Sequence, residues 1–160
     1  MKVLINVLLI AFCITEIIVF DFSEKENINN WSITNDNVMG GLSSSKMVIN
    51  DQGEGVFSGT VSTRNNGGFA MTRLPVDITL LENSSKLVIK LKGDGKKYQF
   101  RIKSEKEQLF WYIQSFQTST ETEKIALPLN AFYASLRGNK LDVENFSAKK
   151  NTRNCDSYRE

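Results

Sequence analysis

Two loops rich in asparagine and glycine carry the side chains best suited to binding a ligand. Asn35, Asp36 and Asn37 precede one pair of glycines, and Asn65 and Asn66 precede another pair. Amide and carboxylate oxygens beside glycine turns suit calcium or the hydroxyls of a sugar. The same residue types also form turns in which the side chains hydrogen-bond to their own backbone. Both interpretations, ligand loop and structural turn, stay open for each loop.

Two arginines are the best candidates for gripping an acidic group. Arg73 and Arg101 lie on predicted strands, opposite the apolar faces. Side by side on a surface, they would bind a carboxylate or an acidic partner through paired hydrogen bonds. Interior ion pairs with Asp36 or Asp94 are the alternative.

Catalytic chemistry is poorly served by this composition. The chain has no histidine, which excludes Ser-His-Asp and Cys-His catalysis and removes the commonest ligand of zinc and copper. Glycoside hydrolysis needs two facing carboxylates, and no spacing brings together Asp36, Glu54 and Asp94. The segment Gly93 to Lys96 lacks the spacing of a phosphate loop. We therefore predict no enzyme, no catalytic residue, no metal site and no cofactor.

Short β-type runs separated by glycine, asparagine and serine must position these residues, and the pattern is typical of a sandwich or barrel. A short helical connection is expected before Trp31. An aromatic run with apolar residues on both faces predicts a central strand, although Trp111, Tyr112 and Phe116 could instead form a platform for sugars. The predicted strands cover residues 17–22, 56–62, 69–74, 109–116 and 125–129, the last interrupted by a proline that belongs at an edge or a strand end.

The clearest local signal is a predicted β-hairpin. Apolar residues alternate with polar ones over 87–91 and again over 98–102. Asp94-Gly95 lies between the two runs and supplies the positive φ angles that tight turns need. We expect the two runs to pair with each other.

The length of the chain favours one domain, and its first residues favour a leader segment. The 160 residues, 41% of them hydrophobic, suffice for a single core. A net charge of +2 gives no reason to expect nucleic acid. Lys2 followed by apolar residues 3–14 is typical of a secretory signal and is shorter than the ~20 residues of a membrane helix. We predict a signal-like segment over 1–16, with an exported or periplasmic protein if it is cleaved and a membrane-anchored or cytoplasmic one otherwise.

Six clusters of residues occur in an order that points to a known family. They are Asn35 to Ser43 after Trp31, Asn65 to Phe69 with Arg73, Gly93 to Lys96 with Tyr98, Phe100 and Arg101, Ser115-Phe116 with Thr118, Leu127 to Leu129 with Phe132, and Arg137-Gly138. Over residues 17–148 the chain resembles the complex I intermediate-associated protein 30 family, as a small single-domain member of bacterial type.

The resemblance implies a galactose-binding-like jelly-roll β-sandwich and a role in assembling respiratory complex I. We therefore expect a non-catalytic, chaperone-like module that binds a protein partner, such as a respiratory-complex subunit or an assembly intermediate. A carbohydrate-binding module of an exported protein is the alternative, since the implied architecture suits sugars. The expected contact residues are Asn35, Asp36, Asn37, Asn65, Asn66, Arg73 and Arg101.

The tail over 149–160 departs from the family pattern. It lacks apolar alternation where the resemblance implies another buried strand. Reading the back-translated codons one nucleotide later permits an apolar strand, so we hypothesise a frameshift. If the tail is instead natural, the sandwich lacks its last one or two strands and exposes an open sheet edge.

Overall fold

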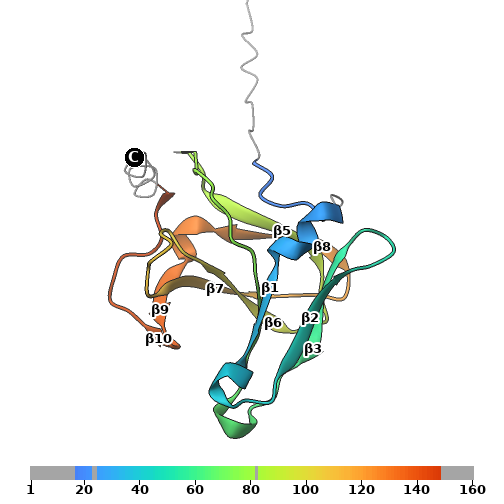
Figure 1. Ribbon diagram of the computed structural model, residues 1–160. Coiled ribbons are helices and arrows are strands. Elements are labelled where there is room, and N and C mark those ends of the chain that lie inside the picture. The colour runs from blue at the N-terminus through green and yellow to red at the C-terminus, as the bar shows by residue number, and fades with distance from the viewer. Residues whose placement is uncertain (1–16, 23–24, 82, 149–160) are drawn as a thin grey trace, which may run out of the picture. The chain divides into compact units, whose positions relative to one another are not determined.

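The computed structural model describes residues 17–22, 25–81 and 83–148 (Figure 1). They form antiparallel strands joined by turns and short 3-10 helices, so the predicted all-β fold class is confirmed. Among these residues no helix is long and apolar enough to cross a membrane. The predicted leader over 1–16 and the tail over 149–160, with its hypothesised frameshift, lie outside the described residues and stay predictions.

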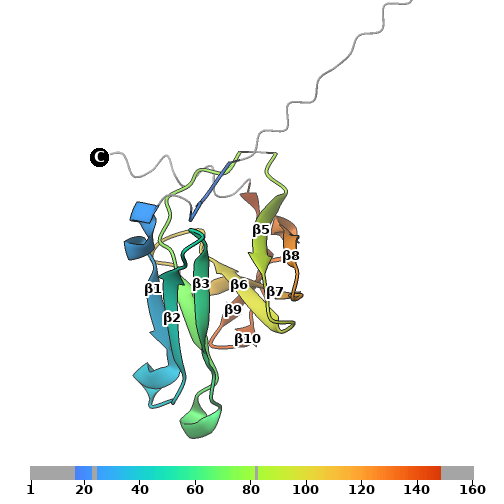
Figure 2. The ribbon, with the colours of Figure 1, turned by 90° about the vertical axis from the view of Figure 1, so that its right-hand side faces the viewer.

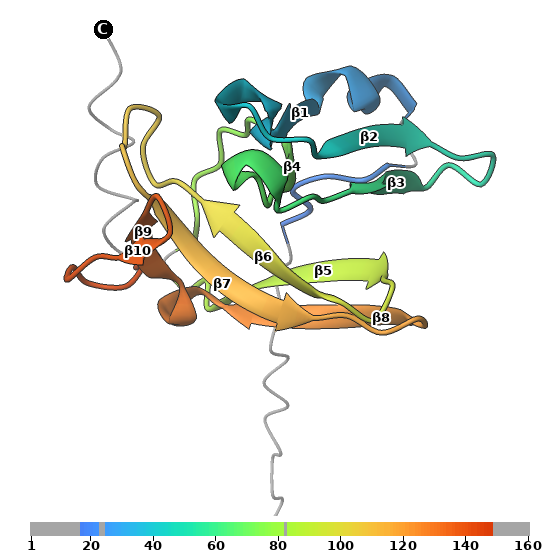
Figure 3. The same ribbon diagram turned by 90° about the horizontal axis from the view of Figure 1, so that it is seen from below.

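The described residues divide into two compact units, one within 1–78 and one within 79–160, each with its own sheets. In the first unit, β2 pairs with β3 (Figure 2) and β1 with β4 (Figure 3), all antiparallel. Strand β2 alternates as expected of a half-covered strand, with Ser44, Lys46 and Val48 exposed. The elements of this unit are η1 (Lys25–Asn30), β1 (Ser32–Asn35), η2 (Asp36–Met39), β2 (Ser44–Ile49), β3 (Gly55–Thr60), η3 (Arg64–Asn66) and β4 (Ala70–Arg73).

The predicted strand over 17–22 is wrong. Its described residues have no regular secondary structure. Phe20 and Phe22 instead pack their rings against Trp31, at centroid distances of 5.1 and 5.4 Å. Aromatic packing thus fixes this segment without a ladder of backbone hydrogen bonds. The helical connection expected before Trp31 is confirmed as η1.

The second unit contains two antiparallel sheets (Figure 3). One joins β5 to β8, and the other has the order β10-β9-β7-β6. The aromatic strand β7 has a neighbour on each side, which confirms its predicted central position, and β8 ends at its proline as expected. The bounds are β5 (Lys86–Lys92), β6 (Lys97–Ile102), β7 (Trp111–Gln117), β8 (Thr122–Pro128), η4 (Leu129–Ala131), β9 (Tyr133–Leu136) and β10 (Asn139–Lys140).

The predicted hairpin between the runs 87–91 and 98–102 is also wrong. Strand β5 pairs with β8, whereas β6 pairs with β7. The connecting turn binds a different segment: Gly93 N–H donates to the Ser119 carbonyl, and Thr118 N–H donates to the Lys96 carbonyl. The turn therefore carries the chain from one sheet to the other instead of closing a hairpin.

A hydrophobic core lies between the two sheets of the second unit, which makes this unit a small sandwich. Phe132 is at its centre, fully buried, with its ring edge-on to Phe100 at 6.2 Å. Tyr112 and Phe116 pack against this core, which supports the core interpretation of the aromatic strand. The buried core residues are Leu127, Leu129, Phe132, Phe146 and Ala148.

Candidate functional site

The first unit is organised around one buried carboxylate. Asp36 follows the last residue of β1 and begins η2, and only 1% of its surface is exposed. Gly40 ends this turn with φ at 87°, a left-handed conformation that glycine adopts without strain. The chain thereby folds back, and Gly41 N–H donates to the Asp36 carbonyl.

Four donors from two loops bind the Asp36 carboxylate. Ser43 provides its backbone N–H at 2.9 Å and its hydroxyl at 2.5 Å. Gly68 and Phe69 provide backbone N–H groups at 2.6 and 3.2 Å. The Ser43 hydroxyl, and then the backbone groups of Gly68, Ser43 and Phe69, lower the pKa of Asp36 to about 2, although burial acts in the opposite direction.

Serine side chains extend this network to the neighbouring strands. The Ser43 hydroxyl accepts a hydrogen bond from Ser62 N–H at 2.9 Å, and the Ser45 hydroxyl donates to the Asn35 side chain at 2.6 Å. We call Asp36, Ser43, Ser62, Gly68 and Phe69 the Asp36 clamp. It holds the loop after β1 against the loop before β4.

Glycine is required where the chain passes the carboxylate. A β-carbon on Gly41 would lie 2.3 Å from Asp36 Oδ1, and one on Gly67 would lie 2.6 Å from Asp36 Oδ2. Real side chains do not approach so closely. The glycine pairs of both loops therefore permit close packing around Asp36 as well as turning the chain.

The two asparagine-glycine loops meet in the structure. Asn35 is half-buried, whereas Asn37, Asn65 and Asn66 are exposed. Asn65 and Asn66 have φ angles of 54° and 57°, so two asparagines adopt the left-handed conformation in this loop, while Gly67 has φ at -74°. The carboxylate of Asp36 is occupied by the protein's own donors, as in a structural turn. Contact of these residues with a partner stays a prediction.

The two arginines belong to different units. Arg73 ends β4, and its Nε donates to Met71 Sδ at 3.4 Å. Arg101 lies on β6 and donates to the Gln99 side chain at 2.8 Å. Their joint grip on an acidic group stays a prediction.

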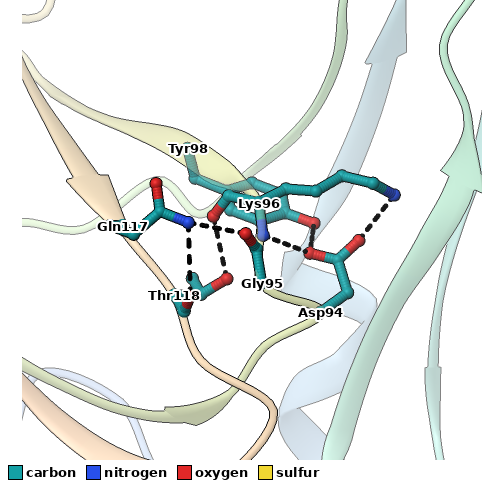
Figure 4. A network of polar contacts seen from close by, with 6 residues as sticks. All are labelled: Asp94, Gly95, Lys96, Tyr98, Gln117 and Thr118. Atoms are coloured by element: carbon teal, nitrogen blue, oxygen red, sulfur yellow. Dashed lines mark hydrogen bonds and ion pairs between the residues drawn. The ribbon is translucent and has the colours of Figure 1, made fainter.

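A second polar network fixes the turn between β5 and β6 (Figure 4). Asp94 pairs with Lys96 Nζ at 2.7 Å and accepts a hydrogen bond from the Tyr98 hydroxyl at 3.0 Å. The Lys96 contact lowers the pKa of Asp94 and raises that of Lys96, and burial, followed by Asp94, raises the pKa of Tyr98. Thr118 and Gln117 donate to the carbonyls of Lys96 and Gly95 at 2.8 and 2.6 Å. These contacts stabilise the turn in which the chain passes from the β5–β8 sheet to the sheet that contains β6.

Sequence reasoning missed one feature of the clamped loop. Val38, Met39 and Leu42 are 75%, 70% and 51% exposed. We call these three residues the apolar tip. The sequence signal for their exposure was the position of three large apolar residues within a stretch of asparagine and glycine. The stretch has neither helical nor strand periodicity.

In the described part of the chain, no three His, Cys, Asp or Glu side chains come together to hold a metal ion. The most strongly perturbed carboxylate described, Asp36, is bound by protein donors and shielded from solvent. The exposed side chains of the two loops are those of Asn37, Val38, Met39, Leu42, Val61, Thr63, Arg64, Asn65 and Asn66.

Comparison with known proteins agrees with the resemblance seen in the sequence. The sequence model described as complex I intermediate-associated protein 30 matches residues 20–153. One curated relative is the mouse (Mus musculus) protein named complex I intermediate-associated protein 30, mitochondrial, which is 25% identical over 150 residues. The match covers 79% of this chain, and the chain spans 45% of the mouse protein.

Proposed function

Because the chain belongs to the complex I intermediate-associated protein 30 family, we propose that it is a non-catalytic assembly factor that binds a protein partner. The partner is an intermediate of respiratory complex I, and the module acts as a chaperone for it. The family match carries this proposal, since it extends over residues of both structural units. The mouse relative is itself named for association with a complex I intermediate.

The geometry of the first unit supports binding over chemistry. In the Asp36 clamp, backbone and serine donors bind the carboxylate and hold the two loops in place. These rigid loops expose apolar side chains and amides. Rigid surface loops lose little conformational entropy when a partner binds. Such loops on a sheet scaffold are common positions for recognition sites.

Affinity purification of the full chain tests the proposed function. The tagged protein is expressed in cells of the source organism, cross-linked, and its partners are identified by mass spectrometry. Subunits of complex I should be enriched over a control that carries the tag alone. Deletion of the gene should also reduce assembled complex I on native gels, with a smaller intermediate accumulating.

Two results would contradict the proposal. The first is normal complex I assembly in the deletion strain together with no enrichment of its subunits. The second is selective binding of the purified chain on a glycan array, which would favour the carbohydrate-binding alternative.

A further inference from the structure

We propose that the apolar tip and the neighbouring Arg64 form the docking surface of this protein for an apolar, acidic segment of its partner. This inference deepens the proposed function by assigning the surface and the chemistry of the partner segment. Val38 and Met39 lie at the end of η2, and Leu42 follows it; Arg64 begins η3 in the loop that the Asp36 clamp holds against this segment (Figures 1 and 2).

The fold does not explain the residue types at the tip. A 3-10 turn that ends in a left-handed glycine makes no demand for valine, methionine or leucine at its exposed positions. Exposed apolar surface costs about 25 cal/mol per Å² relative to burial. Val61, on the strand side of Ser62, adds a further apolar side chain that is 55% exposed. Several exposed apolar side chains within two loops that are held together favour an interaction site.

The Asp36 clamp preorganises the tip. Four hydrogen bonds to one carboxylate fix the start of η2, and Ser43 fixes the backbone just after Leu42. The tip is therefore held between two anchored points. A loop already ordered before binding gives up less entropy on docking. Met39 can still adapt its flexible thioether chain to the shape of a partner.

The charge of the two loops selects the partner. Over residues 35–43 and 61–69 the ionisable side chains are Asp36 and Arg64. Asp36 is buried and fully bound, so Arg64 supplies the charge that solvent and partners meet. The Arg64 guanidinium makes no ion pair with another described residue, and it is suited to a carboxylate bound through two hydrogen bonds.

Exposed amides in the two loops provide the polar rim that a protein interface usually has. Asn37, Asn65 and Asn66 are exposed around the tip, and their side-chain amides make no hydrogen bond to other described residues. Protein interfaces commonly have an apolar centre and a polar rim. The expected occupant is thus a segment with leucine-like anchors and at least one aspartate or glutamate beside them.

Three synthetic peptides of equal length test the proposal on the full chain. One combines leucines with glutamates, the second replaces the glutamates by lysines, and the third replaces the leucines by serines. Fluorescence anisotropy should show the leucine-glutamate peptide bound about 10-fold more tightly than the leucine-lysine peptide, a difference of about 1.4 kcal/mol. The serine peptide should not bind. Equal binding of the first two peptides, or binding of none, would overturn the proposal.

Variants locate the binding. The tip triple Val38→Ser, Met39→Ser, Leu42→Ser should weaken binding of the leucine-glutamate peptide at least about 10-fold. A control triple of exposed apolar residues outside the two loops, Val76→Ser, Leu109→Ser, Val143→Ser, should leave it unchanged. Equal losses in both triples would count against the tip. Arg64→Glu should reverse the preference toward the leucine-lysine peptide, which loss of folding could not produce.

Three further outcomes separate this inference from its rivals. If anionic phosphatidylglycerol vesicles bind the wild type and lose binding in the tip triple, while the peptides show no preference, the tip is a membrane contact and the proposal fails. If the tip triple still copurifies complex I subunits as the wild type does, the docking surface is wrong and the proposed function stands. If the peptide preference holds and no complex I subunit is recovered, the proposed function fails instead.

Discussion

The carboxylate of Asp36 accepts a 2.6 Å hydrogen bond from the backbone N–H of Gly68, although 32 residues separate them in the chain. The contact begins where the β1–β4 ladder ends, since Asn35 and Ala70 are its last paired residues. Asp36 N–H continues the pairing by donating to the Phe69 carbonyl. The Asp36 side chain thus continues the contacts between β1 and β4 into the loops that follow β1 and precede β4.

Asp36→Asn should lower the stability of the protein. The amide keeps one acceptor oxygen but directs an NH₂ group toward a backbone or hydroxyl donor, which leaves buried donors unsatisfied. The midpoint of urea denaturation, followed by circular dichroism, should fall. Asp51→Asn is the matched control, because Asp51 is exposed in the turn between β2 and β3. Equal shifts for the two variants would contradict the role of the clamp.

The contribution of Asp36 should depend on pH in a defined direction. Its pKa is about 2 in the folded protein and close to 3.8 when unfolded, so the folded state favours the charged carboxylate. The stabilisation is therefore fully present above pH 3.8 and is lost as pH falls toward 2. The difference in unfolding free energy between wild type and Asp36→Asn should be constant from pH 5 to 7 and should shrink between pH 4 and 2. A difference that does not change over that interval would show that the carboxylate charge is unimportant.

Adjacent glycines should respond differently to alanine. Gly40→Ala should cost about 1–2 kcal/mol, because the left-handed backbone disfavours a β-carbon while the space around it is open. Gly41→Ala should cost more, because its β-carbon would lie 2.3 Å from Asp36 Oδ1 and would displace the carboxylate. Thermal denaturation of the two variants gives the comparison. A greater loss at Gly40 would mean that backbone strain outweighs packing around Asp36.

The core of the second unit should depend on Phe132. Removing its ring in Phe132→Ala should cost about 3–5 kcal/mol, because the side chain is fully buried between the sheets. Leu109→Ala should change stability by no more than about 0.5 kcal/mol, since Leu109 is 84% exposed. Unfolding free energies from urea titrations would test both values. A small loss for Phe132→Ala would place the core elsewhere.

Alternation in the sequence identified strands better than it identified their partners. The runs around Leu87 and Phe100 are both strands, as predicted. Their pairing differs from the prediction because a period of two residues fixes which face is buried and carries no information on the neighbouring strand. The 17–22 run failed for a related reason: Phe20 and Phe22 are apolar because they contact Trp31, without being part of a sheet.

The residue types of the site could be predicted from the sequence, but their arrangement in space could not. Asparagine, aspartate and glycine correctly indicated two turns around Asp36 and Asn65. That the Asp36 carboxylate would bind Gly68 depends on the β1–β4 pairing, which is a long-range property of the fold. The exposure of Val38 and Met39 follows from that arrangement and could not be read from composition.

The pairing of β5 with β8 determines the order in which the second unit can be completed during synthesis. Strands β6 and β7 leave the ribosome before β8 has been synthesised. Until then Leu87, Ile89 and Leu91 of β5 lack their neighbours on β8. Long-range pairing of this kind slows folding. Lys86, Lys90 and Lys92 lie along β5, and their charge discourages other nascent copies from adding to its edge. Since β8 is the one described strand that pairs with β5, the lysines protect an edge of β5 both before and after β8 is translated.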